Sequence, residues 1–301
     1  MLLDMFGVNV MRENKLIQFY LTNMCNSLCK TCNIWQNRPE LKLELDFEYV
    51  KNVIKEYPDA DFVFGGGEVT LYSQLGELLK YCDVHEINYT LLTNAINVHA
   101  VEKILEKYNV KNLTISCDGL KHDSIRVQDR IKNLDNIIYL VKKYLGKIDN
   151  LKISYTLSTF NENHIDEDME FFKTLGIEKI YFCIAQNMEL LGAKGKITPS
   201  TASLKYIYET YGYMLYDRDK EFLNRLLYGE KGPCQSLNNV HTIYTNGDVV
   251  LCQSYMCDNI LGNIKYEPSL HGILKNSGIE KVTFDCPFVK ECELVCQRRY
   301  D

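Results

Sequence analysis

The sequence lacks any long apolar run and any block of lysine or arginine. A membrane-spanning helix needs roughly 18 consecutive apolar residues, and no stretch approaches that length. Residues 1–5, MLLDM, place an acid early, with no basic region before an apolar one. The formal net charge is −6, which argues against nucleic acid or an anionic membrane surface as the main partner. We therefore expect a cytoplasmic protein that binds neither nucleic acid nor membrane.

The sequence also has no low-complexity segment and no internal repeat beyond an alternation of strand and helix patterns. Its 301 residues are 46% hydrophobic, which is enough to bury a substantial core. The length suits one large domain, or a large domain with a small one.

Twelve cysteines are present, and a disulfide framework is not expected in a reducing compartment. Cys82, Cys117 and Cys183 lie in apolar segments, so we expect them in the hydrophobic core. The other nine group towards the two ends of the chain, where clustered thiols indicate metal binding.

Apolar strand-like runs alternate with helical periodicities up to about residue 185. The runs cover 15–22, 61–65, 87–93, 112–117, 151–158 and 178–184. The helical patterns cover 46–57, 73–82, 97–108, 131–145 and 163–175. Asp46 is the expected N-cap of the first helix. This alternation predicts an α/β fold with six parallel strands and right-handed crossovers, in a sheet that is either doubly wound or barrel-like.

The pattern changes in the last third of the chain. A tyrosine-rich helical stretch at 200–228 follows a polar segment rich in structure breakers. Short strands and six cysteines come after it, and Asn246–Gly247 between apolar arms predicts a β-hairpin. We therefore divide the chain into a core at 1–190, a helical connector at 191–230 and a small cysteine-rich hairpin domain at 231–301.

Three cysteines, Cys25, Cys29 and Cys32, fall within eight residues just after the first predicted strand. Three thiolates on one loop can converge on one metal centre, and a cubane iron–sulfur cluster needs four ligands. A local triplet therefore leaves one iron open to another molecule. A structural zinc loop and three unrelated core cysteines are the alternatives, although no fourth cysteine or histidine lies nearby.

Glycine and polar residues stand at the ends of the next three predicted strands. They are Gly65–Gly66–Gly67–Glu68, then Asn94, then Ser116 and Asp118. Parallel β/α folds place their functional sites at these carboxyl ends. Taken alone, the glycine–glutamate run is better explained by a flexible strand-to-helix turn, and Ser116 and Asp118 by a helix cap or a turn.

The cysteine spacing after Thr22–Asn23 resembles the cluster loop of the radical S-adenosylmethionine (SAM) superfamily. This resemblance implies a partial (β/α)6 barrel similar to a TIM barrel. It also implies a 4Fe–4S cluster whose three ligands are the catalytic cysteines of that loop. Gly66, Gly67 and Glu68 match the family's glycine–glycine–glutamate motif, which binds the amino group of the methionine moiety of SAM.

Two further segments carry the same resemblance. Residues 93–95 resemble the family's Thr-Asn-Gly turn, with alanine in place of glycine. The order Ser116, Asp118 and Arg126 resembles the segment that reaches the ribose and the carboxylate of SAM. The resemblance therefore implies cofactor contacts from Asn94, Ser116, Asp118, Arg126 and, by packing on adenine, Ile184.

The cysteines near the C-terminus resemble those of the SPASM domain and its shorter relative, the twitch domain, which hold auxiliary iron–sulfur clusters. The candidate ligands are Cys234, Cys252, Cys286, Cys292 and Cys296, with Cys257 as a spare thiol. Thr283 stands where the full pattern has a cysteine, so we expect one auxiliary 4Fe–4S cluster rather than two. A zinc ribbon is the alternative.

The resemblance implies an enzyme that cleaves SAM reductively to a 5′-deoxyadenosyl radical, which abstracts hydrogen from a substrate. An electron donor such as flavodoxin or ferredoxin is implied as a partner, and the auxiliary cluster would aid a net oxidation or a crosslink. A peptide side chain and a small polar metabolite are equal candidates for the substrate. The chain reaches its cluster strand by residue 15, so we expect peptide recognition, if any, to come from a separate partner. An iron–sulfur relay or sensor and a zinc-binding structural protein are the competing hypotheses.

Overall fold

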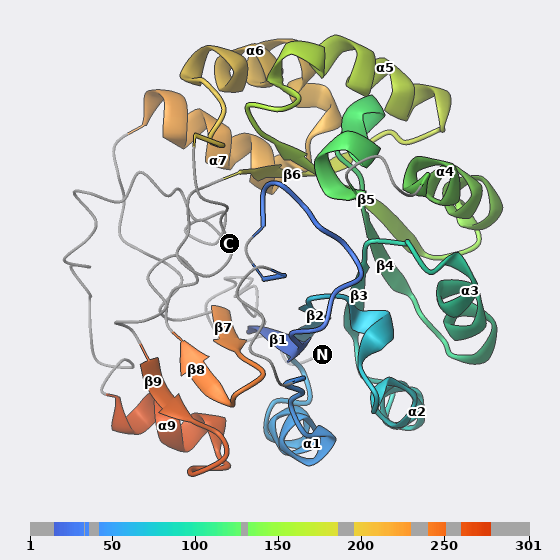
Figure 1. Ribbon diagram of the computed structural model, residues 1–301. Coiled ribbons are helices and arrows are strands. Elements are labelled where there is room, and N and C mark those ends of the chain that lie inside the picture. Colours follow the sequence, from blue (N-terminus) through green and yellow to red (C-terminus); the bar gives the residue numbers. More distant parts are fainter. Residues whose placement is uncertain are drawn as a thin grey trace, which may run out of the picture.

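The structure is a computed structural model in which helices cover one side of a curved sheet (Figure 1). It describes residues 15–32, 34–35, 42–127, 132–185, 196–229, 240–250 and 260–277. The six parallel strands are β1 (Leu16–Thr22), β2 (Asp61–Gly66), β3 (Tyr89–Thr93), β4 (Asn112–Ser116), β5 (Asn150–Leu157) and β6 (Ile180–Ile184). The helices that connect them are α1 (Phe47–Glu56), α2 (Leu75–Val84), α3 (Val98–Lys107), α4 (Asn133–Tyr144) and α5 (Ile165–Thr174).

The strand order decides between the two architectures that the sequence left open. The sheet runs β6-β5-β4-β3-β2-β1-β7-β8-β9, so the first six strands are neighbours in chain order without a reversal. A doubly wound sheet reverses its order at a switch point, whereas a barrel-like sheet does not. The helices accordingly lie in an arc on the outer side of the sheet (Figure 1). The predicted partial (β/α)6 barrel is confirmed.

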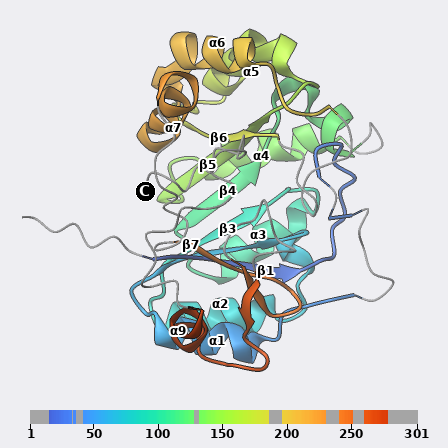
Figure 2. The same ribbon diagram turned by 90° about the vertical axis from the view of Figure 1, so that its left-hand side faces the viewer.

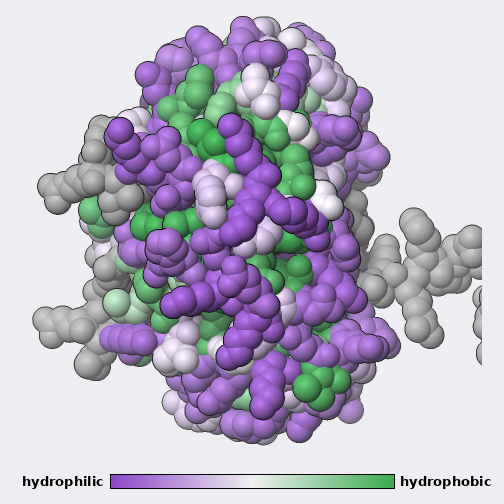
Figure 3. Space-filling model, turned by 90° about the vertical axis from the view of Figure 1, so that its right-hand side faces the viewer, coloured by the Kyte–Doolittle hydropathy of each residue, from purple (hydrophilic) through white to green (hydrophobic). Residues whose placement is uncertain are grey.

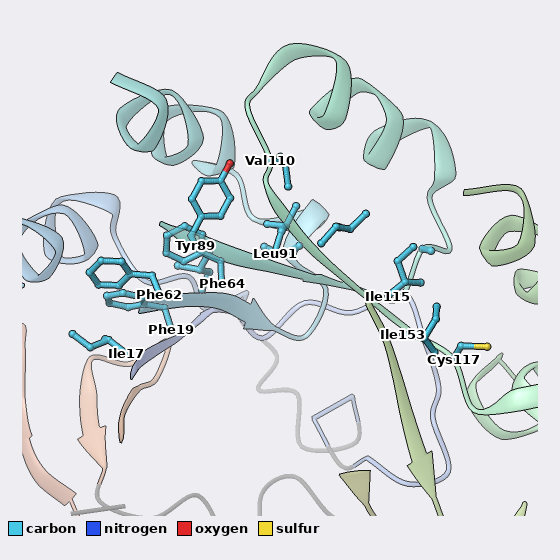
Figure 4. Close-up of a cluster of buried hydrophobic side chains, with 14 of the residues drawn as sticks. Ile17, Phe19, Phe62, Phe64, Tyr89, Leu91, Val110, Ile115, Cys117 and Ile153 are labelled. Carbon is cyan, nitrogen blue, oxygen red and sulfur yellow. The ribbon is translucent and has the colours of Figure 1, made fainter. Parts of the chain in front are cut away.

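The core lies between the sheet and this arc of helices. Phe19, Phe62 and Phe64 stack across β1 and β2, and Tyr89 on β3 extends the row of rings (Figure 4). Helix α1 begins as predicted, because the Asp46 carboxylate accepts a hydrogen bond from the Glu48 amide at 2.8 Å. The apolar residues thus face the helices, and the strand ends are left for polar residues.

Two further helices, α6 (Thr201–Tyr211) and α7 (Asp217–Tyr228), occupy the tyrosine-rich stretch predicted to be helical. Strand β7 (Val240–Ile243) then pairs in parallel with β1. Strands β8 (Asp248–Val250) and β9 (Ile260–Asn263) follow in antiparallel pairing, with the predicted hairpin turn between β7 and β8. The strands beyond residue 230 therefore extend the same sheet.

Hydrophilic residues cover most of the face that carries α3 and α4, with hydrophobic residues scattered among them (Figure 3). This distribution fits helices that bury one stripe against the sheet and leave the other to water. Among the described residues, no helix combines the length and the apolar character that crossing a membrane requires.

The last helix, α9 (Leu270–Asn276), lies beside α1 (Figures 1 and 2). The Glu56 carboxylate at the end of α1 accepts hydrogen bonds from Ser269 Oγ at 2.7 Å, the Leu270 amide at 2.8 Å and the His271 amide at 3.0 Å. A side chain more than 200 positions away in sequence therefore caps this helix.

Replacing Glu56 with alanine is expected to lower the free energy of unfolding by about 1–2 kcal/mol, because three donors lose their acceptor. Urea unfolding and amide exchange at Leu270 and His271 measure the effect. Glu48 is the matched control, since it lies on the same helix, is exposed and pairs only locally with Lys51. Glu48→Ala is expected to change stability by less than about 0.5 kcal/mol, and equal effects of the two substitutions would contradict the prediction.

Candidate cofactor site

The carboxyl ends of β1 to β4 bring the predicted site residues to one edge of the sheet. The cysteine loop follows β1, Glu68 follows β2, Asn94 follows β3, and Asp118 follows β4. Because neighbouring parallel strands end side by side, these groups meet although they lie up to about 90 positions apart in sequence.

Hydrogen bonds within the cysteine loop point towards the sulfur atoms. The Ser27 amide donates to Cys25 Sγ at 3.4 Å, and Ser27 Oγ lies 3.1 Å from Cys29 Sγ. Burial, with a smaller contribution from the neighbouring Cys29, raises the pKa of the Cys25 thiol to about 12 and that of Cys32 to about 11. The three sulfurs therefore lie within one another's electrostatic range. Donors aimed at sulfur stabilise a thiolate and tune an iron–sulfur cluster.

The loop is docked on a single turn of π-helix, Asp123–Val127. Ser27 Oγ and the Leu28 amide donate to the Arg126 carbonyl at 2.7 and 3.1 Å, and the Lys30 amide donates to the Ile125 carbonyl at 2.8 Å. A π-helical turn leaves carbonyl groups without the usual helical partners, and such turns are frequent at functional sites. The segment that carries Arg126 therefore also fixes the position of the cysteine loop.

The two glycines of the predicted SAM motif make room for this loop. A Cβ on Gly66, which has φ +126°, would stand 2.5 Å from the Thr22 carbonyl oxygen, and a Cβ on Gly67 would stand 2.2 Å from the Met24 carbonyl oxygen. The amides of Gly67 and Glu68 donate to the same two carbonyls at 2.7 and 2.8 Å. Glycines at a strand end allow a close approach to the backbone, by a ligand or by another segment. In the structure it is the chain's own backbone that makes this close approach.

Glu68 is 2% exposed and is held by four donors. Its Oε1 accepts from Thr93 Oγ1 at 2.7 Å and from the hydroxyl and amide of Thr70, and its Oε2 accepts from the Asn94 amide at 2.8 Å. Burial raises its pKa, while these hydrogen bonds act in the opposite direction. The carboxylate is therefore rigidly oriented, and Oε2, with one donor, has a lone pair left to accept from a cationic ligand.

Asn94 joins this carboxylate to the cysteine loop. Its Nδ2 donates to Asn26 Oδ1 at 2.8 Å and to Cys25 Sγ at 3.8 Å. The next residue, Ala95, has φ +60°, in the left-handed region that favours glycine. The family's Thr-Asn-Gly turn thus keeps its backbone shape here despite the alanine.

Asp118 and Arg126 form a bidentate ion pair. Arg126 Nε and Nη2 donate to the two Asp118 oxygens at 2.8 and 2.9 Å, and the Thr156 amide donates to Asp118 at 3.2 Å. Asp118 is completely buried. Burial alone would lower the pKa of Arg126, but the facing Asp118 carboxylate raises it above its ordinary value. The guanidinium is therefore charged and fixed in direction at the site.

The remaining predicted residues lie at the same edge but are less enclosed. Ser116 and Ile184 are half-buried at the ends of β4 and β6. Cys82 and Cys117 are core residues as predicted, whereas Cys183 is only half-buried and its sulfur lies 3.7 Å from Ser154 Oγ. The structure therefore corrects the assignment of Cys183 to the core.

The candidate ligands of the auxiliary cluster, and the spare thiol Cys257, lie outside the described residues; the candidate ligands are Cys234, Cys252, Cys286, Cys292 and Cys296. Within the described ranges, no three histidine, cysteine or acidic side chains form a group suited to a metal ion. Whether the loop that carries Cys25, Cys29 and Cys32 suits a cluster is therefore judged from the ligand atoms that it offers. Three thiols on one loop, with donors directed at two of the sulfurs, are the ligands that iron–sulfur clusters use.

This combination of barrel, cysteine loop and strand-end residues agrees with comparison to known proteins. The family model described as the radical SAM superfamily matches residues 19–172, about half of the chain. The chain belongs to the radical SAM superfamily, whose members use a 4Fe–4S cluster and SAM.

Among curated proteins, the chain is similar to the GTP 3′,8-cyclase of Clostridium perfringens (strain SM101 / Type A), with 28% identity over 167 residues. The match covers 51% of this chain and 50% of that protein, so the chain spans about half the length of this relative. The GTP 3′,8-cyclase of Helicobacter pylori is 25% identical over 196 residues, which cover 62% of this chain and 60% of that protein.

Among solved structures, native anSMEcpe with bound AdoMet has a TM-score of 0.64 and 18% identity, covering 92% of this chain and 87% of that one. Streptococcus suis SuiB bound to the precursor peptide SuiA has a TM-score of 0.65 and 17% identity, covering 93% and 67%. At these identities the likeness establishes the fold.

Sequence reasoning missed a buried acid behind this site. Asp168 on α5 is completely buried and accepts from the Leu120 amide at 2.7 Å and from Tyr155 Oη at 2.9 Å. Its pKa is raised from 3.8 to about 7, because burial, helped by the nearby Asp118 and Glu167 charges, outweighs the lowering effect of its two hydrogen bonds. A lone acid in a helical pattern carries no signal that would have singled it out.

The raised pKa predicts a pH dependence of stability. Between pH 4 and pH 7 the folded chain holds a proton on Asp168 that the unfolded chain has released, so stability falls as the pH rises through this range. Relative to Asp168→Asn, which keeps an acceptor for the Leu120 amide, the wild type is expected to lose about 2–3 kcal/mol between pH 5 and pH 8. Urea unfolding of both proteins across this range tests it, and parallel curves would contradict it.

Proposed function

We propose that this protein is a radical SAM oxidoreductase or maturase that abstracts hydrogen from a peptide side chain. When bound, a reduced 4Fe–4S cluster and SAM supply a 5′-deoxyadenosyl radical for this step. The observation that carries the proposal is the docking of the three-cysteine loop on the backbone of the turn that carries Arg126, together with Asn94, which bonds both the loop and the Glu68 carboxylate.

In this proposal, different residues of the site hold the cluster and the separate groups of SAM. Cys25, Cys29 and Cys32 ligate three irons and leave the fourth to SAM. Glu68 accepts from the methionine ammonium group, for which its four fixed donors orient it. The fixed guanidinium of Arg126 faces the methionine carboxylate. Ser116 binds the ribose, and Ile184 packs on the adenine.

The structural neighbours support a peptide substrate. Structures of anSMEcpe with the Cp18Cys peptide and of SuiB with the precursor peptide SuiA share the fold over 92–93% of this chain. A small polar metabolite is the second candidate, favoured by the 28% identity to GTP 3′,8-cyclase over 167 residues. Stimulation of 5′-deoxyadenosine release by a cysteine-containing peptide, with GTP as the competing addition, separates the two candidates.

We also propose one auxiliary 4Fe–4S cluster, held by Cys234, Cys252 and two of Cys286, Cys292 and Cys296. It would accept an electron from the substrate radical or ligate the substrate, which suits a net oxidation or a crosslink. The resemblance of these cysteines to a SPASM or twitch domain supports it. The electron donor would be a flavodoxin or a ferredoxin.

The deciding experiment combines iron analysis with product analysis after anaerobic reconstitution. Wild type is expected to bind roughly eight irons, and Cys25/Cys29/Cys32→Ala roughly four, from the stoichiometry of two cubanes. Reduced wild type with SAM is expected to release 5′-deoxyadenosine, and the triple variant none. Fully loaded wild type that releases none would leave an iron–sulfur relay or sensor as the function. Roughly four irons in wild type and none in the variant would remove the auxiliary cluster.

A further inference from the structure

Two completely buried polar residues, His122 and Asn133, lie behind the cofactor site. His122 directly follows the 3-10 turn Gly119–Lys121, and Asn133 is the first residue of α4. Neither belongs to the site residues predicted from the sequence. Burying two polar side chains is costly unless each is hydrogen-bonded, so their contacts indicate what they do.

The contacts of His122 and Asn133 link the residues at the end of β3 with those at the end of β4. Asn133 Nδ2 donates to the Asn94 carbonyl at 2.7 Å and lies 3.0 Å from His122 Nε2. His122 Nδ1 accepts from the Asp118 amide at 3.2 Å. With Nδ1 accepting, a neutral His122 carries its proton on Nε2, so its contact with Asn133 Nδ2 is close packing of two N–H groups. The path from the end of β3 to the end of β4 therefore consists of two hydrogen bonds joined by this packing contact.

Each end of this path is a charged group of the proposed SAM site. At one end, the Asn94 amide donates to Glu68. At the other, the Asp118 carboxylate holds Arg126 in a bidentate pair. The two charges that would meet the ammonium and the carboxylate of SAM are thus connected through buried side chains.

We propose that His122 and Asn133 are positioning residues that fix the spacing between Glu68 and Arg126, and so contribute to SAM affinity without touching SAM. The inference rests on the proposed function. Small misplacements of binding groups are costly, because a ligand must then adapt or lose a contact. Leaving a buried donor or acceptor unpaired costs about 1–3 kcal/mol, so the hydrogen bond to the Asn94 carbonyl and the one from the Asp118 amide each hold their side chain in one place.

Two observations support the inference. Burial and the nearby Arg126 lower the pKa of His122 to about 4, so the imidazole is neutral near pH 7 and adds no competing charge. The Asp123 carboxylate accepts from the Leu134 amide at 3.0 Å, which clamps the start of the π-helical turn to α4 a second time. Since the cysteine loop docks on that turn, displacement of this segment would disturb both the loop and Arg126.

The test measures SAM binding by calorimetry on the reconstituted holoenzyme, alongside iron content and thermal unfolding. His122→Phe and Asn133→Leu are expected to weaken SAM binding about tenfold or more. The double variant is expected to be no weaker than the weaker single one, because both break the same path. His122→Asn, whose Oδ1 can take the place of Nδ1 towards the Asp118 amide, is expected to recover part of the affinity.

Glu56→Ala is the matched control, since it loses hydrogen bonds far from the site and should keep the affinity of the wild type. Affinities of the two single variants within twofold of the wild type would overturn the inference. Should His122→Phe fail to fold, His122→Asn decides, because it loses the Asn133 contact alone and must show a partial loss. Cluster-loaded wild type that does not bind SAM would instead overturn the proposed function.

Discussion

Replacing Gly67 with alanine is expected to prevent cluster loading and to cost about 3 kcal/mol of stability, because the new methyl group has no space. Its Cβ would stand 2.2 Å from the carbonyl oxygen and 2.6 Å from the carbonyl carbon of Met24. These are backbone atoms at the start of the cysteine loop, which cannot turn away as a side chain can. The amides of Gly67 and Glu68 hold the same backbone, so relief of the clash breaks hydrogen bonds.

Gly65 provides a matched control two residues earlier. A Cβ there would meet only the end of the Leu92 side chain, at 3.2 Å. Gly65→Ala is therefore expected to cost less than about 1 kcal/mol and to leave iron binding intact. Urea unfolding and iron per chain measure both variants. If Gly67→Ala bound iron as well as Gly65→Ala, the close packing of this turn on the loop would be refuted.

The features that the sequence predicts correctly are local ones. Each buried parallel strand is a short apolar run, and each helix has its own stripe and, in α1, its own cap at Asp46. The cysteine triplet is equally local, since three ligands lie on one loop. Such features need no knowledge of what lies elsewhere in the chain.

The features that the sequence does not predict depend on partners far away along the chain. Asp118 was predicted as a cofactor contact, and only the fold shows that both its oxygens are taken by Arg126. His122 lies within the segment that carries the family resemblance, between Asp118 and Arg126, but its contact with Asn133 is seen only in the folded chain. The pairing of β7 with β1, across more than 200 positions, is non-local in the same way.

The glycines show a third kind of difference. A run of glycines at a strand end predicts that something approaches the backbone closely, but it does not say what. Here the approaching atoms are those of Thr22 and Met24. The motif therefore positions the cysteine loop and Glu68 together.

Replacing Asp118 with asparagine is expected to cost about 3–5 kcal/mol of stability and to abolish measurable SAM binding. Removing one partner of a buried ion pair leaves the other charge uncompensated, which is far more costly than losing an exposed pair. Asparagine offers one acceptor oxygen in place of two and turns an amide donor towards the guanidinium of Arg126. The guanidinium would then reorient, and the Thr156 amide would lose its acceptor if the amide group turned with it.

A double variant separates the charge effect from simple disruption. Asp118→Leu/Arg126→Leu removes both charges and is expected to be more stable than Asp118→Asn, because no unpaired charge stays buried. It should nevertheless fail to bind SAM, since the cation at the site is gone. Glu102→Gln, which breaks the partly exposed pair with Lys143 at the surface, is the control and should cost less than about 1 kcal/mol. Urea unfolding and calorimetry measure all three proteins. A double variant less stable than Asp118→Asn would mean that shape, rather than charge, makes this pair necessary.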